Sequence, residues 1–117
     1  MIIRIKNLRL RTINGINDWE RKEKQDFVIN AEITYDGGRA VATDDVAHAL
    51  NYRTVTKRIV QVVEESRFYL LEKLADAVLQ TIMEDPAARR ARVEVDKLHA
   101  LRFADSVSVE CETTREP

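Results

Sequence analysis

The N-terminal part of the chain alternates hydrophobic and polar positions in two stretches, a pattern typical of β-strands with one covered face. In the first stretch, from residue 2 to about residue 13, the hydrophobic parity changes near Asn7 and predicts a β-bulge. The second stretch covers residues 26–36, and its hydrophobic positions are Phe27, Ile29, Ala31, Ile33 and Tyr35. We therefore expect two long strands. Most of the charged run 20–24 between them is expected to lie in a solvated hairpin loop.

The middle of the chain changes to a helical period. The segment 43–45, Thr-Asp-Asp, is expected to cap and open a short helix that ends near Ala49, and Asn51 to cap a second helix. A third helix follows Phe68 and ends before Pro86. The hydrophobic positions with helical spacing are Val55, Ile59, Val62 and Val63 in the second helix, and Leu71, Leu74, Ala75, Val78, Leu79 and Ile82 in the third.

Alternation returns over residues 92–97 and 106–112. The predicted order is β-β-α-α-β-β, an α+β fold in which an antiparallel four-stranded sheet carries two long helices on one face. The other sheet face is expected to be polar, so that it either lines a wet tunnel or faces solvent; its positions are Asn30, Glu32, Thr34, Glu94, Asp96, Ser108 and Glu110. A chain of 117 residues fits a single domain, residues 1–117.

Composition narrows the classes of function. The formal net charge of -1 argues against general nucleic-acid binding, which needs a basic face. Charges follow Met1-Ile2-Ile3 at once and no hydrophobic run has the length of a membrane span, so we expect no signal peptide, no membrane association and a cytoplasmic protein. The only cysteine, Cys111, cannot form an internal disulfide and is expected to be a buried core thiol.

Chemical motifs are sparse. The sequence has no nucleophile elbow, phosphate loop, dinucleotide fingerprint or CxxC pair. His48 and His99 lack the spacing of zinc ligands, so we expect no metal and no other cofactor. Four polar residues stand at strand ends, helix starts or in the charged run, and each has an ordinary structural explanation: Glu20, Tyr52, Glu72 and Lys97. These features alone indicate an α+β domain whose polar residues have no assigned role.

Read in order, the same positions resemble the dihydroneopterin aldolase/epimerase family over about residues 2–112. The matching segments are Gly15-Ile16-x-x-x-Glu20 with Gln25 five residues later, Asp44-Asp45-Val46, Leu50-Asn51-Tyr52, Leu70-Leu71-Glu72 and Val93-Glu94-Val95-Asp96-Lys97. Each segment is weak evidence alone, but their order and spacing together are a strong signal.

Three stretches, residues 3–12, 50–57 and 96–107, look like the epimerase branch of this family. Aldolases usually have Lys-Pro where this chain has Lys97-Leu98, although Asp18-Trp19-Glu20 also resembles aldolases. The resemblance implies epimerisation at C2′ of 7,8-dihydroneopterin triphosphate to 7,8-dihydromonapterin triphosphate, by retro-aldol cleavage and re-addition. Two alternatives remain open: an aldolase that gives 6-hydroxymethyl-7,8-dihydropterin and glycolaldehyde, and a non-catalytic oligomeric pterin-binding protein.

The resemblance also implies a fold and an assembly. In the tunnelling fold, four subunits join their sheets into a barrel, two such rings usually stack into an octamer, and the active sites lie between subunits. The family uses no metal. The expected partners are therefore a small pterin substrate and further copies of this chain.

The residue roles implied by the resemblance divide into catalysis and binding. The catalytic residues are Lys97, Glu20 and Tyr52, the last contributed by a neighbouring subunit. The residues that bind the pterin are Glu72 through its carboxylate, Leu71 through its backbone, Asn51 and Ile16. We add the hypothesis that His99, Arg102 and Arg11 are cations that anchor the triphosphate, since a fragment held in this way would stay long enough to be added back.

Overall fold

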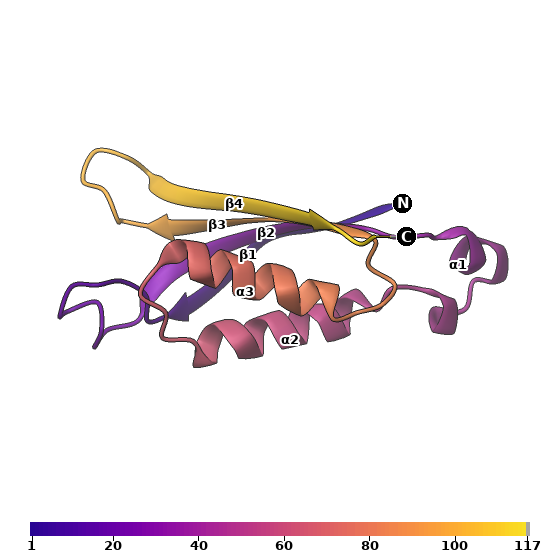
Figure 1. Cartoon of the computed structure of the whole chain (residues 1–117), viewed down its shortest axis with the longest axis horizontal. Coiled ribbons are helices and arrows are strands. Elements are labelled where there is room, and N and C mark those ends of the chain that lie inside the picture. The colour runs from indigo at the N-terminus through magenta and orange to yellow at the C-terminus, as the bar shows by residue number, and fades with distance from the viewer. Residues whose placement is uncertain (117) are drawn as a thin grey trace.

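A computed structural model of the chain, which describes residues 1–116, shows a long four-stranded antiparallel sheet with helices against one face (Figure 1). The strands lie in the order of the sequence: β1 (Ile2–Thr12), β2 (Gln25–Thr34), β3 (Arg90–Leu98) and β4 (Ser106–Thr114). Two long helices, α2 (Tyr52–Glu65) and α3 (Leu71–Met83), connect β2 to β3 and pack on the same side of the sheet. The predicted α+β fold and its β-β-α-α-β-β order are confirmed.

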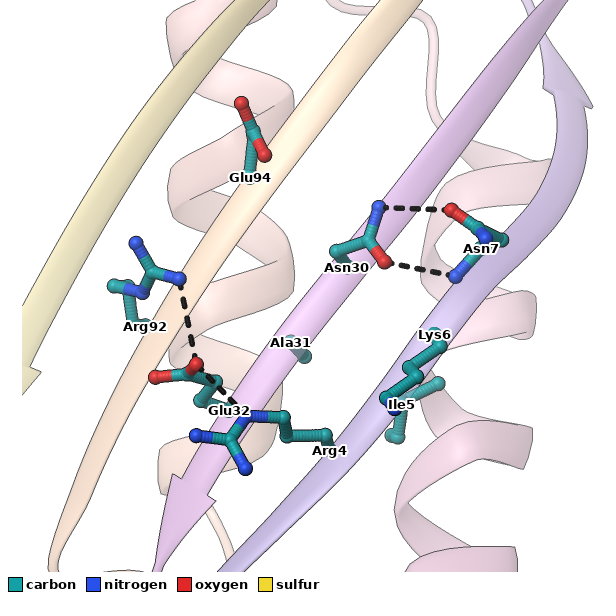
Figure 2. Close-up of a pocket in the computed structure, with 9 residues that line it drawn as sticks. All are labelled: Arg4, Ile5, Lys6, Asn7, Asn30, Ala31, Glu32, Arg92 and Glu94. Atoms are coloured by element: carbon teal, nitrogen blue, oxygen red, sulfur yellow. Dashed lines mark hydrogen bonds and ion pairs between the residues drawn. The ribbon is translucent and has the colours of Figure 1, made fainter.

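The predicted bulge in β1 is present. The register with β2 shifts between Ile5 and Leu8, so that hydrophobic residues on both sides of the bulge face the helices. Asn7 takes the extra position with a φ of 54°, a conformation that asparagine tolerates better than most residues. Its backbone N–H donates to Oδ1 of Asn30 at 2.8 Å, which replaces the lost ladder bond (Figure 2).

The core lies between the sheet and the two long helices. Its largest fully buried side chains include Phe27, Ile29, Ile33, Val55, Ile59, Val63, Leu74, Val78, Ile82, Val93 and Val95. These are the positions that the periods of two and 3.6 residues select, because each element has only one covered face. In the described part of the chain no helix is both long and hydrophobic enough to cross a membrane.

The segment between β2 and α2 differs from the prediction. A helix, α1 (Gly38–Thr43), comes before the predicted one and ends at Asp44 in the left-handed conformation. Asp45 then caps a 3₁₀-helix of three residues, η1 (Val46–His48), through a bond from the backbone N–H of Ala47 at 2.9 Å. Neither short helix buries any residue, so neither could be predicted from hydrophobic periodicity.

Two smaller corrections concern β4 and the strand ends. Cys111 is half-buried at the margin of the core rather than fully buried, and burial raises the pKa of its thiol, with smaller contributions from nearby carboxylates. Both C-terminal strands are longer than the alternation alone indicated, since β3 begins at Arg90 and β4 ends at Thr114. Their additional residues are mostly polar and paired across the ladder.

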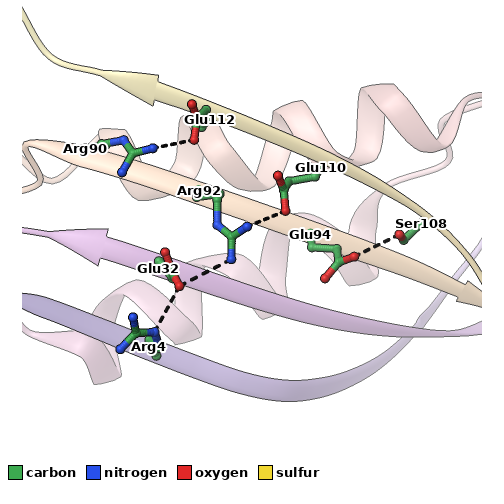
Figure 3. A network of polar contacts seen from close by, with 8 residues as sticks. All are labelled: Arg4, Glu32, Arg90, Arg92, Glu94, Ser108, Glu110 and Glu112. Carbon is green, nitrogen blue, oxygen red and sulfur yellow. Dashed lines mark hydrogen bonds and ion pairs between the residues drawn. The ribbon is translucent and has the colours of Figure 1, made fainter.

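The second sheet face carries a row of alternating charges (Figure 3). Glu32 accepts bonds from Arg4 at 3.0 Å and from Arg92 at 3.4 Å, and Arg92 in turn donates to Glu110 at 2.6 Å. These guanidinium groups hold the pKa of Glu32 below its usual value, although burial acts in the opposite direction. In the single chain this polar face is open to solvent.

Candidate active site

Lys97 stands at the end of β3, on the helix-covered face of the sheet, where the connection between β1 and β2 (residues 13–24) approaches it. Its Nζ donates to Oε2 of Glu20 at 2.6 Å and to the backbone oxygen of Asn14 at 3.1 Å. Lys97 is 8% exposed and Glu20 is 7% exposed. An ammonium group has three donors, so two fixed bonds leave one N–H for a ligand.

The β1–β2 connection is shaped around the Glu20 carboxylate. Gly15 has a φ of +133°, and a Cβ added there would lie 2.3 Å from Cδ and Oε2 of Glu20, so only glycine fits. Asn17 donates to Oε1 through its backbone N–H at 3.2 Å and through Nδ2 at 2.9 Å. Burial raises the pKa of Glu20, but the hydrogen bonds from Lys97 and Asn17 and the charge of Lys97 together lower it below the usual value. The charged form of the Glu20 carboxylate is therefore favoured.

A hollow of about 320 Å³ adjoins this pair. It is lined by Asn14, Gly15, Ile16, Glu20, Tyr69, Leu70, Leu71, Glu72, Lys97, Ala100, Val107 and Val109. Glu72 lies in the first turn of α3, whose N-terminus has no side-chain cap. Backbone N–H groups in a first turn have no acceptor within the helix, so α3 offers both a carboxylate and backbone donors to this hollow.

The structure thus brings together five of the predicted site residues from three separate parts of the chain: Ile16, Glu20, Leu71, Glu72 and Lys97. It does not bring Tyr52 and Asn51 to them. Both lie at the opposite end of α2, and a helix of 14 residues is about 20 Å long. Figure 1 shows this end of α2 on the side of the molecule where α1 lies, far from the β1–β2 connection. Tyr52 is 54% exposed and lines a different hollow with Asn51 and Val46.

The sequence matches the family model of dihydroneopterin aldolase (FolB) over residues 3–112. The chain belongs to the dihydroneopterin aldolase family. It is 56% identical to a Pseudomonas aeruginosa protein named dihydroneopterin triphosphate 2′-epimerase, across 92% of this chain and 87% of the relative. It is 32% identical to the Escherichia coli (strain K12) dihydroneopterin aldolase, across 92% of this chain and 88% of the relative. The resemblance to the epimerase branch is confirmed at this level of similarity, and both relatives are enzymes.

A solved structure in the family has the same fold. The E. coli dihydroneopterin aldolase in complex with neopterin matches this structure with a TM-score of 0.91 and 31% identity, across 97% of this chain and 98% of that one. The antiparallel sheet with its two long helices is therefore the family's architecture.

Three residues were expected to bind the triphosphate: His99, Arg102 and Arg11. Among the described residues 1–116, none of the three lines the hollow beside Lys97. His99 and Arg102 are exposed in the connection between β3 and β4 (residues 99–105), whose Ala100 does line the hollow. Arg102 packs over the Phe103 ring at 5.6 Å, and Arg11 pairs with Asp26 at 3.1 Å. The first two cations therefore neighbour the hollow, whereas Arg11 already has a carboxylate partner.

Sequence reasoning missed two supporting residues of this dihydroneopterin aldolase family site. Asn14 is 1% exposed; its carbonyl oxygen accepts from Lys97 and from Gln25 at 2.8 Å, and its Nδ2 donates to the Leu70 oxygen at 3.1 Å. Asn17 holds Glu20 as described above. The available signal was Gly15, which lies between these two asparagines. In residues 1–116, no group of three or more His, Cys, Asp and Glu side chains is arranged to hold a metal ion.

Proposed function

We propose that this protein epimerises 7,8-dihydroneopterin triphosphate at C2′ and forms 7,8-dihydromonapterin triphosphate. The observation that carries the proposal is the Lys97–Glu20 pair, which is buried beside the same hollow as Glu72. Sequence similarity selects the epimerase over the aldolase, since identity is 56% to the named 2′-epimerase and 32% to the named aldolase over equal shares of this chain.

Glu72 is suited to bind the flat pterin ring. A carboxylate accepts two parallel N–H bonds, and the 2-amino group and N3 of a pterin present such a pair of donors. Glu72 is exposed in the single chain and lies at the uncapped start of α3, where the backbone of Leu71 adds a further polar contact. Ile16 contributes hydrophobic surface from the β1–β2 connection. Together these groups orient the ring and leave its side chain toward Lys97.

The reaction needs few protein groups because the dihydropterin ring accepts electrons. When the C1′–C2′ bond breaks, its electron pair moves into the adjacent ring C=N bond, and the 2′-hydroxyl loses its proton to form an aldehyde. A water molecule held by the remaining N–H of Lys97 accepts this proton and returns it when the aldehyde is added back, and Glu20 fixes the Lys97 ammonium group in place. Adding the turned aldehyde back re-forms the bond with the opposite configuration at C2′. Release of the aldehyde after protonation of C1′ would instead be aldolase activity.

The remaining catalytic group, Tyr52, comes from a neighbouring copy in this proposal, with Asn51 beside it. Within one chain they lie at the far end of α2 from the β1–β2 connection, and this helix is about 20 Å long. Large hydrophobic side chains are exposed at both ends of the molecule, at Val46 near Tyr52 and at Phe103 near the Lys97 hollow. β1 and β4 are also open sheet edges. These features support a tetrameric ring, with two rings forming an octamer.

Mixed oligomers test the shared site. Tyr52→Phe and Lys97→Ala proteins should each be nearly inactive, whereas a refolded 1:1 mixture should recover activity in about a quarter of its sites. A mixture that stays as inactive as its components would place both residues of each site on one chain. Size measurement of the same samples reports the ring and its stacking.

The triphosphate anchor is proposed at His99 and Arg102, with Arg11 as a further cation. Exposed cations beside the hollow can pair with phosphate oxygens and slow the departure of the cleaved fragment. Neutral substitutions at His99 and Arg102 should raise KM for the triphosphate more than for unphosphorylated dihydroneopterin. Equal changes in both KM values would remove these residues from the anchor.

The decisive experiment is product analysis. Purified protein is incubated with dihydroneopterin and with its triphosphate, without added metal, and the products are separated by chromatography. We expect the full-length epimer from the triphosphate. Turnover should be lost in Lys97→Met and normal in Lys22→Met, because Lys22 is exposed in the β1–β2 connection. Pterin binding without turnover would instead indicate the non-catalytic binding protein.

Aldolase activity is the second candidate. It is favoured by the family model, which is described as dihydroneopterin aldolase, and by the close match to the solved aldolase. Its products, 6-hydroxymethyl-7,8-dihydropterin and glycolaldehyde, would appear in the same assay with the unphosphorylated substrate.

A further inference from the structure

Two connections that are far apart in the sequence contribute to the hollow beside Lys97. The β1–β2 connection supplies Gly15 and Glu20, and the connection between α2 and α3 (residues 66–70) supplies Tyr69 and leads directly into Glu72. The distance between the Lys97–Glu20 pair and the Glu72 carboxylate therefore depends on how firmly these connections are held together.

Arg21 joins the two connections. Its Nη1 donates to the backbone oxygens of Gly15 and Phe68, both at 3.1 Å, and its Nη2 donates to the backbone oxygen of Arg67 at 2.6 Å. Its guanidinium carbon lies 4.0 Å from the centre of the Tyr69 ring. One side chain thus fixes the backbone of both connections and one aromatic wall of the hollow.

These contacts reach the reacting groups in two directions. The Gly15 backbone packs directly against the Glu20 carboxylate, so a displaced Gly15 would displace the partner of Lys97. On the other side, the 67–69 backbone determines where α3 begins and hence where Glu72 lies. Arg21 itself does not line the hollow among the described residues, so its effect on a ligand is indirect.

We propose that Arg21 is a positioning residue that sets the Lys97–Glu20 pair at the correct distance from the ring-binding start of α3. The proposal deepens the proposed function and rests on it for the identity of the substrate. A guanidinium group is required because it is planar and carries five donors in a fixed fork, which suits three carbonyl oxygens and an aromatic face at once. Lysine can make only part of these contacts, and methionine fills the space without donating.

Kinetics of Arg21→Met, Arg21→Lys and the control Lys22→Met test this role. Because Glu72 keeps its carboxylate and still binds the ring while its distance from the catalytic pair is wrong, we expect Arg21→Met to lower kcat about 10- to 100-fold with a much smaller change in KM. Arg21→Lys should recover part of kcat, and Lys22→Met should match the wild type. A kcat within about twofold of the wild type in folded Arg21→Met would overturn the proposal.

A second measurement does not depend on turnover. Carboxyl ¹³C NMR follows the titration of Glu20, whose pKa is lowered by Lys97 and Asn17. Arg21→Met should return the pKa of Glu20 toward the ordinary value, Arg21→Lys should do so less, and Lys22→Met should leave it low. An unchanged pKa of Glu20 in both Arg21 variants would overturn the positioning role. If the wild type turns over neither pterin, the proposed function fails, whereas this titration still decides the role of Arg21.

Discussion

Lys97 Nζ and Glu20 Oε2 lie 2.6 Å apart although the two residues are separated by 77 positions in the chain. The Arg90–Glu112 ion pair on the polar sheet face has the same length, 2.6 Å, but its side chains are 45% and 53% exposed. The two ion pairs therefore differ in interaction energy although their N–O distances are equal, because water screens the exposed pair and is largely excluded from the buried one.

A double-mutant cycle should show this difference. Lys97→Met and Glu20→Gln should each destabilise the protein by about 1–3 kcal/mol, because each leaves a buried polar group without its partner. The double variant should lose less than the sum of the two. The same cycle at Arg90 and Glu112 should give a coupling of about 0–1 kcal/mol. Urea unfolding measures all of these values, and a coupling at Lys97–Glu20 no larger than at Arg90–Glu112 would contradict the burial argument.

The free energy of unfolding should fall at acid pH, partly because Glu20 becomes protonated. Its pKa in the folded state is lowered from 4.5, so its stabilising contribution is fully present above that value. The contribution is lost as the pH falls through the lowered pKa, because the folded state then binds the proton that the unfolded state already carries. The difference in unfolding free energy between wild type and Glu20→Gln should therefore shrink below about pH 4.5. Glu23→Gln, an exposed change in the same connection, should show no comparable trend.

The long helices and strands could be predicted because each buries one face, which gives its sequence a periodic pattern of hydrophobic residues. Phe27, Ile29 and Ile33 alternate on one face of β2, and Val55, Ile59 and Val63 follow one face of α2. α1 buries no residue and has no side-chain cap, so its sequence shows neither signal of a helix, whereas the short helix after it could be predicted from the cap at Asp45.

The site was harder to predict than the fold, for a physical reason. Glu20 lies in a charged run that looks solvated, and only its contact with the distant Lys97 distinguishes it. Asn14 acts partly through its backbone oxygen, which every residue has, so no side-chain type signals that contact. The site residues could be predicted only because the segments around Gly15, Glu72 and Lys97 resemble a known family in their order along the chain.

Gly15→Ala should damage both folding and activity. The φ of +133° is strained for alanine, and the new Cβ would collide with the Glu20 carboxylate, which is held on its other side by Lys97. We expect a loss of about 1–3 kcal/mol of stability and a clear fall in kcat. Gly38→Ala is the matched control, since its Cβ would meet only the exposed Asp36 side chain at 3.2 Å. Thermal unfolding and steady-state kinetics separate the two variants, and a Gly15→Ala protein as active as Gly38→Ala would contradict the fit of Glu20 against Gly15.

The last prediction separates two roles of Asn51. Its Oδ1 accepts from the backbone N–H groups of Arg53 and Thr54, both at 3.1 Å, and so caps α2, while our proposal also places Asn51 at the pterin site of a neighbouring copy. Asn51→Ala should cost about 0.5–2 kcal/mol of stability, and Asn51→Ser should restore most of it because serine also caps helices.

Activity then decides whether Asn51 does more than cap α2. If Asn51 shapes the shared site, Asn51→Ser should keep its stability and still show a raised KM for the pterin. A normal KM in that variant would leave only the capping role. Asp45→Ala removes the cap of the exposed three-residue η1 and serves as the control, with little change expected in unfolding free energy because η1 buries no residue.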